Sequence, residues 1–423
     1  MTDAFPSLSR TRREFLSAMG AISALGLVSF ESWPTHASHP ATTRSTRSPR
    51  GLAAPDDFLF ASELVYLQTG SLGPTPRPVM ERTIAAWKEL ELNPSFYGYG
   101  AHEHAMDDVV RVSAARFLGC KTEELVLTRC TTDGMNTVAQ GLTFAAGDRV
   151  LTTDQEHPGG RHCWDYVARR FGVAIDVVAI PPGENDAQAV VDRFAKAITP
   201  RTRVLSFSHL LSSTGLRMPV AQLSALARSH GCLAVVDGAQ AVGGIPVDVK
   251  ALGCHVYATS GHKWLLGPKG TGLLYLSEEL GDRVDIASTA PGHAAYGEGT
   301  GVTSIPSVLG LGAAVEYLSA MGMDRIEAHN LALRNRLFAA LHDVPKVRVM
   351  SAPAGPLASG LVTFTLPDER ESRAFQLMMR EKHNVELKMV PKNWLNGIRV
   401  STHLFNTEQD VDRLIAALKR ELA

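Results

Sequence analysis

The stretch Cys232-Leu-Ala-Val-Val-Asp-Gly-Ala-Gln240 decides the fold, because its apolar first half is typical of a buried parallel strand that ends at Asp237. The same order recurs in Cys254-His-Val-Tyr-Ala-Thr-Ser-Gly-His-Lys-Trp264, where an apolar segment over 254–258, a second expected strand, leads into small polar residues and then Lys263. In open α/β sheets, ligands bind outside the carboxyl ends of the strands. The two stretches therefore predict that Asp237 and Lys263 lie together at one edge of a sheet.

Asp237 and Lys263 are the residue types that pyridoxal phosphate (PLP) chemistry requires. PLP withdraws electrons only while its ring nitrogen stays protonated, so a carboxylate must lie against that nitrogen and a lysine must form the Schiff base. A desolvated lysine near cationic groups has a lowered pKa, which suits imine formation and proton transfer. Singly, such an aspartate is usually a turn or cap residue. The prediction therefore depends on the pair.

Phosphate-binding groups are expected at the same edge. The stretch Thr128-Arg-Cys-Thr-Thr-Asp-Gly-Met-Asn136 follows a short apolar strand and opens an amphipathic helix, whose first N–H groups suit a phosphate. Thr131 and Thr132 would add hydroxyl donors there, although Ser and Thr are also ordinary N-cap residues. Ser260 and His262, directly before Lys263, are further polar groups that suit a phosphate.

Together these segments resemble the class V aminotransferase family of fold type I PLP enzymes, which includes cysteine desulfurases, isopenicillin N epimerase-like enzymes and related C–S lyases. The resemblance runs from about Tyr66 to the C-terminus. It implies an α/β fold with a central, mostly parallel seven-stranded sheet and a smaller α+β C-terminal domain. It also implies PLP as the cofactor, an amino acid as the small-molecule substrate and a homodimer.

The resemblance assigns roles to further residues. His157, which follows the short strand expected over 149–152, is similar to the histidine that stacks on the pyridine ring and helps to move protons at the substrate carbon. Gln240 is similar to the residue that hydrogen-bonds the phenolic oxygen of the cofactor. Arg399, in Gly397-Ile-Arg-Val-Ser401, is similar to the arginine that clamps the substrate α-carboxylate through a bidentate pair.

Two other segments match the family less closely. Thr300, in Glu298-Gly-Thr-Gly301, resembles the threonine that crosses the dimer interface to the partner's cofactor phosphate. Ser212 stands where the family often carries an asparagine near the cofactor or substrate, so that contact differs here.

The expected activity is that of an aminotransferase, with an epimerase or C–S lyase as the alternative. All three begin when Lys263 removes the α-proton, and they differ in the fate of the resulting carbanion. A cysteine desulfurase is disfavoured, because the C-terminal segment 384–393 supplies no thiol and none of the five cysteines lies beyond Cys254. An acidic substrate would need a second cation, for which Arg161, Arg217 and Lys388 are unranked candidates.

The N-terminus resembles a twin-arginine signal. Ser9-Arg-Thr-Arg-Arg-Glu-Phe-Leu16 precedes a Gly/Ala-rich apolar stretch over 18–30 that is too short to span a membrane, and Thr35-His-Ala37 offers a cleavage site. We expect a signal peptide over 1–37, a flexible linker over 38–54 and export by the twin-arginine translocation machinery to the periplasm or beyond, without a stable membrane anchor. The alternative is a disordered basic tail.

Composition fits a large globular enzyme of more than one domain, because 45% of the 423 residues are hydrophobic. Short apolar strands alternate with helical patterns, such as those over 220–229 and near 310–321, which is typical of a parallel sheet covered by helices on both faces. We expect a large PLP-binding domain over 55–323 and a small C-terminal domain over 324–423. No nucleic-acid partner is expected, since 42 Lys and Arg balance 43 Asp and Glu.

Other chemistries fit less well. A nicotinamide or flavin enzyme is disfavoured, because Gly310-Leu-Gly312 lacks the third glycine of a dinucleotide fingerprint. No metal site is expected, because His102-Glu-His104 lacks the helical spacing of a zinc motif. Lys269 is a second-choice Schiff-base lysine, and a binding protein that has kept the fold is the non-enzymatic alternative.

Overall fold

The largest element of the structure is a mixed seven-stranded sheet. The structure is a computed structural model that describes residues 51–54, 56–61, 63–97, 101–285, 303–392 and 394–423. Along the sheet the strands follow the order β2-β8-β7-β6-β5-β3-β4, and all run parallel except β8, which is antiparallel to β2 and β7. The mostly parallel seven-stranded sheet is therefore confirmed. The strands are β2 (Leu125–Thr128), β3 (Arg149–Thr153), β4 (Ala174–Val178), β5 (Thr202–Ser208), β6 (Leu233–Asp237), β7 (Val256–Ser260) and β8 (Gly272–Leu276).

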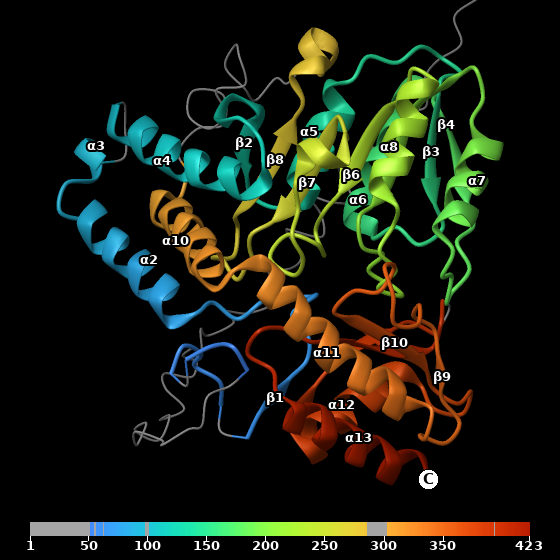
Figure 1. Cartoon of the computed structure of the whole chain (residues 1–423). Helices are drawn as coiled ribbons and strands as arrows, with labels where there is room; N and C mark the ends of the chain where they lie inside the picture. Colours follow the sequence, from blue (N-terminus) through green and yellow to red (C-terminus); the bar gives the residue numbers. More distant parts are fainter. Residues whose placement is uncertain (1–50, 55, 62, 98–100, 286–302, 393) are drawn as a thin grey trace, which may run out of the picture. The chain divides into compact units, whose positions relative to one another are not determined.

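Helices cover both faces of this sheet (Figure 1). In β6, Leu233 and Val235 enter one hydrophobic core with side chains of α5 and α6, whereas Ala234 and Val236 enter another with side chains of α4, α7, α8 and α10. Because both faces are buried, the central strands are continuous apolar runs, as expected for a parallel sheet. The helices of this part are α2 (Arg77–Leu90), α3 (Pro94–Tyr97), α4 (Ala101–Leu118), α5 (Thr131–Gly141), α6 (Pro158–Phe171), α7 (Ala187–Ala197), α8 (Val220–Ser229), α9 (Val249–Leu252) and α10 (Ile305–Met321), with 3-10 turns η1 (Thr122–Glu124) and η2 (Glu278–Arg283).

A second, four-stranded antiparallel sheet follows in the chain, in the order β12-β13-β10-β9. Residues from the N-terminal part complete its core, because β1 pairs with β11 in parallel and Val65 and Leu67 are fully buried there. The elements of this part are β1 (Val65–Tyr66), α11 (Met323–Leu341), β9 (Arg348–Val349), β10 (Leu361–Thr365), α12 (Ser372–His383), β11 (Val385–Glu386), β12 (Lys388–Val390), β13 (Gly397–Ser401) and α13 (Glu408–Leu422).

The expected element positions differ from the observed ones by a few residues. Helix α8 has the predicted bounds, whereas α10 begins at Ile305, five residues before the predicted start, because Pro306 is well accommodated in a first helical turn. The edge strand β4 was not predicted, and its residues are mostly only partly buried. Central strands are thus easier to recognise than edge strands, since a continuous apolar run requires burial on both faces.

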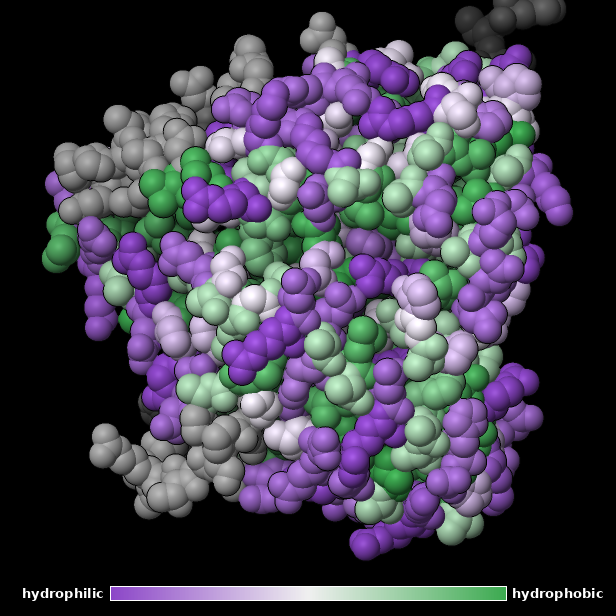
Figure 2. All heavy atoms as spheres, in the orientation of Figure 1, coloured by the Kyte–Doolittle hydropathy of each residue, from purple (hydrophilic) through white to green (hydrophobic). Residues whose placement is uncertain are grey.

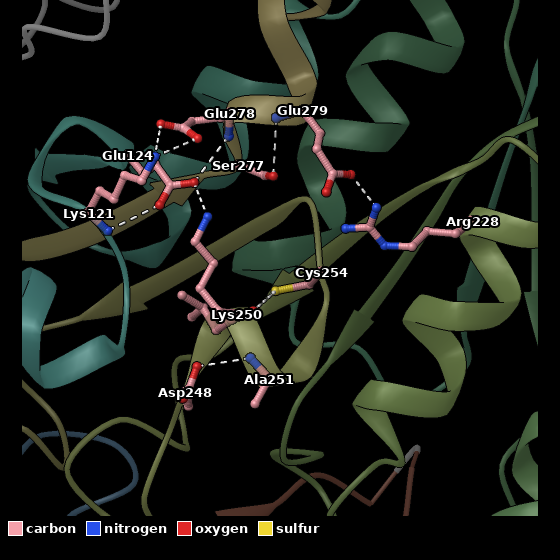
Figure 3. A network of polar contacts seen from close by, with 11 residues as sticks. Lys121, Glu124, Arg228, Asp248, Lys250, Ala251, Cys254, Ser277, Glu278 and Glu279 are labelled. Carbon is pink, nitrogen blue, oxygen red and sulfur yellow. Dashed lines mark hydrogen bonds and ion pairs between the residues drawn. The ribbon is translucent and has the colours of Figure 1, made fainter.

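An ion-pair network lies at the edge of the sheet where β2 and β7 begin and β8 ends, opposite to Asp237 (Figure 3). Glu124 is buried and accepts hydrogen bonds from Lys250 and from the backbone N–H groups of Lys121 and Glu278. Although burial acts to raise the pKa of Glu124, these hydrogen bonds lower it on balance. The surrounding ion pairs are Lys121–Glu278 and Arg228–Glu279. The network ties the turns of this edge together, away from the candidate site.

No single helix among the described residues is long and apolar enough to span a membrane. Helices α10 and α11 pass that test only as a pair, with a bend of 77° between them. Much of α10 is buried in the hydrophobic core between α2 and α4.

Candidate active site

Asp237 ends β6 at the carboxyl edge of the large sheet, as predicted. It is 5% exposed, and its Oδ1 accepts a hydrogen bond of 2.9 Å from the backbone N–H of Ala239. Burial raises the pKa of Asp237, while Lys263 acts to lower it. Its Oδ2 faces Gly160, where a Cβ atom would lie only 2.4 Å away, so only glycine leaves this oxygen room. The carboxylate is thus held in place with one oxygen available to a donor.

Lys263 follows β7 by a short turn and is partly buried. Burial lowers the pKa of Lys263, Asp237 opposes that decrease, and Arg399 adds to it. The backbone N–H of Gly73 donates to the carbonyl of His262 over 2.7 Å, and a Cβ atom at Gly73 would lie 2.0 Å from the carbonyl oxygen of Lys263. The N-terminal segment therefore packs directly on the turn that carries the lysine. The lowered pKa of Lys263 favours a neutral, nucleophilic amine.

The first turn of α5 forms the predicted phosphate end. Thr131 is buried, and Ser260 Oγ accepts its backbone N–H over 2.9 Å and lies 2.7 Å from its hydroxyl. Thr132 is exposed, and its Oγ1 is close to Gly159 at the start of α6. His262 is partly buried, and burial together with Lys263 and Lys269 lowers its pKa to about 4. This end therefore offers hydroxyl groups and a neutral imidazole around a helix N-terminus.

His157 is the N-cap of α6. Its Nδ1 accepts a hydrogen bond of 3.0 Å from the N–H of Gly159. Burial lowers the pKa of His157 to about 4, and Lys263, Arg399 and Lys388 add to this decrease. The ring is therefore neutral near pH 7 and carries its proton on Nε2. The same electrostatic interactions show that these three cations lie around His157.

Arg399, on β13, is a buried cation without an acidic partner among the described residues. It is 5% exposed, its Nη1 donates to the carbonyl of Ser212 over 2.8 Å, and its Nη2 donates to Ser71 Oγ over 3.0 Å. Its Nε is buried and has no hydrogen-bond partner there. Burial lowers the pKa of Arg399 to about 10, so the group stays charged at pH 7. An unpaired buried cation of this kind suits a carboxylate ligand.

Gln240 connects the segments around this edge. Its Nε2 donates to the carbonyl of Gly70 over 2.8 Å, and its Oε1 accepts from Trp264 Nε1 over 2.8 Å. The amide oxygen is thus occupied, while Nε2 keeps a second proton for the predicted contact to a phenolic oxygen. Ser212, in turn, holds Arg399 through its backbone carbonyl, a contact that does not require asparagine.

The sequence interpretation missed two residues at this site. Ser71 holds Arg399, and the glycine- and proline-rich turn over 69–74 was the available signal for a close backbone approach. Glu156 accepts hydrogen bonds of 2.6 Å from the hydroxyls of Thr153 and Ser208, and burial raises its pKa to about 7. It fixes the turn before His157, and no sequence pattern marked it.

The three candidate second cations differ in their partners. Arg161 donates to Asp165 over 3.2 Å, and Arg217 forms an ion pair of 2.7 Å with Glu327. Lys388 has neither kind of partner among the described residues and lies directly opposite Arg399 in the antiparallel pairing of β12 with β13.

Some predictions remain without a structural description. Thr300 and the N-terminal signal lie outside the described residues, as do the side chains of His102 and His104. In the part of the chain that the structure covers, no group of three or more His, Cys, Asp or Glu residues could hold a metal ion. All five cysteines are free, and Cys130 is the N-cap residue of α5.

Taken together, the site residues fit PLP. Asp237 offers a buried carboxylate oxygen for a protonated ring nitrogen, Lys263 offers an amine of lowered pKa, and the N-terminus of α5 offers a phosphate site. Arg399 has no acidic partner among the described residues, so its guanidinium suits a substrate carboxylate.

Known proteins resemble this chain over most of its length. The isopenicillin N epimerase of Amycolatopsis lactamdurans is 32% identical over 84% of this chain and 94% of the relative. A cysteine desulfurase of Klebsiella pneumoniae (strain 342) is 30% identical, with coverage of 84% and 93%. Two structures of C-DES superpose with TM-scores of 0.76 and 0.75 at 25% and 26% identity, covering 85% of this chain and 97% and 98% of C-DES. One contains glycine covalently linked to the PLP cofactor, and the other shows this cystine C–S lyase with its product cysteine persulfide.

The description of the matching family model is "Aminotransferase class-V", and the match covers residues 65–414. The family resemblance expected from Asp237, Lys263 and Arg399 is thereby confirmed, as is the α/β fold. The chain belongs to the class V aminotransferase family.

Proposed function

We propose that this class V enzyme uses PLP to transfer the amino group of an amino acid. The observation that carries the proposal is that Asp237 and Lys263 lie at one edge of the large sheet while the charge of Arg399, on β13 of the second sheet, acts on Lys263. No carboxylate is paired with Arg399 among the described residues. PLP is the cofactor of this chain, and when bound it supplies an electron-withdrawing ring that stabilises negative charge at the substrate α-carbon.

Each of the three residues has a distinct task. Asp237 would hold a proton at the ring nitrogen through its free Oδ2. Lys263 would bind the cofactor covalently through Nζ and, once an amino acid has displaced it, would take the α-proton. Arg399 would orient the substrate carboxylate by parallel N–H donors, and its burial keeps water from competing for them. Gly70, Ser71 and Gly73 close the site from the N-terminal side.

The state of His157 supports an aminotransferase. Its Nδ1 lone pair is occupied by the N–H of Gly159, and its lowered pKa keeps the ring neutral near pH 7. A neutral ring N–H is too weak an acid to supply a proton on the opposite face, which an epimerase with two proton-carrying groups would require. Lys263 alone can move the proton from the α-carbon to the cofactor, as amino transfer requires.

Amino-acid epimerisation is the second candidate, because a relative that is 32% identical is an isopenicillin N epimerase. C–S cleavage is a third, because C-DES has the same fold. A cysteine desulfurase that uses a C-terminal thiol stays disfavoured, since segment 384–393 has no cysteine and Cys130 lies at the phosphate end instead.

One experiment separates these activities. The purified enzyme with PLP is mixed with a panel of amino acids, without a 2-oxo acid, while the visible absorbance is followed. An aminotransferase converts its cofactor lastingly to pyridoxamine phosphate and releases one equivalent of 2-oxo acid. An epimerase keeps its absorbance while the amino acid racemises and takes up solvent deuterium, and a lyase releases sulfide or persulfide. Failure to bind PLP would contradict every form of the proposal.

We also propose a homodimer, supported by exposed apolar side chains on one side of the molecule (Figure 2, left). Isolated exposed apolar residues are ordinary, whereas several that share one side indicate an interaction surface. Most belong to α2 and α4 or their flanking turns. They are Leu72, Ile84, Trp87, Leu92, Val109 and Val112, which are 45–81% exposed.

Trp87→Glu should weaken this dimer at least about a hundredfold, because a charge would replace an aromatic contact in the interface. Sedimentation equilibrium measures the change. Val177→Glu on the edge strand β4 is the control, since Val177 is equally exposed, at 50%, but lies in a different element, and it should leave the dimer intact. A wild-type protein that sediments as a monomer at micromolar concentration would contradict the proposal.

Export by the twin-arginine route is a further proposal, supported by the sequence of residues 9–37. The double substitution Arg12→Lys/Arg13→Lys should retain the protein in the cytoplasm of a host with twin-arginine machinery, and cell fractionation with immunoblotting measures this. Arg10→Lys is the matched control and should be exported. Equal export of both variants would reject this route.

A further inference from the structure

Lys388 and Arg399 form a pair of like charges that no acidic residue neutralises in the described part of the chain. They are directly opposite in the pairing of β12 with β13, so their side chains lie on the same face of the sheet with Cβ atoms about 5 Å apart. Like charges in this position are destabilising. The arrangement therefore costs stability in the free protein unless a ligand neutralises it.

The face that carries this pair is the face of the candidate active site. Thr363 continues the row on the other side of Arg399, and its hydroxyl donates to the carbonyl of Ser213 over 2.6 Å. Arg399 donates to the neighbouring carbonyl of Ser212. Lys388, in the same row, therefore lies on the face of this sheet that contacts residues 212 and 213. It is partly buried, and its charge acts on His157 together with those of Lys263 and Arg399.

The charged groups that act on the pKa of Lys388 are both cations. Burial lowers the pKa of Lys388, and Arg399 and Arg373 both add to the decrease. Arg399 does not need help with a single carboxylate, because three of its five N–H donors have no protein partner among the described residues. The ammonium group of Lys388 is thus not needed to bind one α-carboxylate.

We infer that Lys388 binds a second anionic group of the substrate, so that the enzyme acts on an amino acid whose side chain carries a carboxylate. This inference rests on the proposed function, in which Arg399 takes the α-carboxylate. Arg161 and Arg217 are not available for the task, since each already pairs with an acidic residue.

Binding of acids that cannot react tests the inference separately from the reaction. The enzyme with PLP is titrated calorimetrically with glutarate and glutaramate, and with succinate and succinamate. Each pair differs only in that an amide replaces one carboxylate. For at least one pair the dicarboxylate should bind about tenfold to a hundredfold more tightly, which is the range of a charge-assisted hydrogen bond.

Lys388→Met should reduce this preference to about twofold and leave the affinity for the half-amide within about threefold of the wild type. Lys382→Met removes an exposed lysine of α12 that forms an ion pair with Glu421, and this variant should keep the preference. Lys388→Met should also raise the unfolding midpoint of the ligand-free protein, because the repulsion of Arg399 is relieved. That rise confirms that the variant folds.

Two results would overturn the inference. Equal affinity for acid and half-amide in both pairs would show that no second carboxylate is recognised. Equal weakening of both ligands by Lys388→Met would show that Lys388 shares the α-carboxylate with Arg399. Neither result concerns PLP binding, whereas a protein that binds no PLP would contradict the proposed function itself.

Discussion

Lys263→Ala is expected to lower turnover by a factor of about 10⁴ or more, because the variant loses both the covalent anchor of the cofactor and the base for the α-proton. The fold should persist. The lysine lies on a turn, and Asp237 beside it already has a raised pKa, so its carboxyl group can take up a proton when the neighbouring cation is lost. Borohydride reduction followed by mass spectrometry should find the cofactor attached to wild-type Lys263 and to no residue of the variant.

The matched control is Lys269→Ala. Lys269 is exposed, and its Nζ donates to the carbonyl of Gly73 and to Thr75 Oγ1, both over 3.0 Å. Its variant should keep the covalent cofactor, because these hydrogen bonds only support the turn. Attachment that persists in Lys263→Ala and disappears in Lys269→Ala would move the cofactor to the second lysine.

Arg399→Met should have the second-largest effect, and in opposite directions for binding and stability. The substrate carboxylate loses a bidentate charged contact, so kcat/KM should fall by a factor of about 10² to 10⁴. The free protein should become more stable, because a buried guanidinium with an unsatisfied Nε is replaced by an apolar side chain. Steady-state kinetics and thermal unfolding without ligand measure the two effects.

Arg399→Lys separates charge from geometry. Lysine keeps the positive charge but cannot donate in parallel to Ser212, Ser71 and a carboxylate, so most of the loss in kcat/KM should remain. A variant Arg399→Met that is both fully active and less stable than the wild type would show that Arg399 is a structural residue.

The sequence predicted the elements that place Asp237 and Lys263, because central parallel strands are continuous apolar runs and ligands bind at their carboxyl ends. The edge strand β4 was not predicted, because most of its residues are only partly buried and do not form a continuous apolar run. Strand limits shifted by one or two residues, as in β7, which was expected over 254–258 and spans Val256–Ser260. A hydrophobic pattern predicts which face of a strand is buried. It predicts less reliably at which residue the pairing with a neighbouring strand begins.

The site was less predictable than the fold, because its contacts join distant segments. Ser71 reaches Arg399 across 328 residues, and no local pattern reports such a distance. The ranking of Arg161, Arg217 and Lys388 likewise depended on their partners, which only the folded chain shows. The family resemblance assigned a role to Gln240, but its hydrogen bond with Trp264 came from the structure.

The pairing of β1 with β11 has a consequence for how the molecule is made. Gln68 and Glu386 hydrogen-bond across 318 residues, and Gly70 meets Ser401 across 331. During synthesis on the ribosome, the early segment must wait, unpaired, until its late partner has emerged. A chain that stops before Ser401 contains all seven strands of the large sheet but lacks the contact that Ser401 makes with Gly70. Each chain can therefore complete its active site only after almost its whole length has been translated.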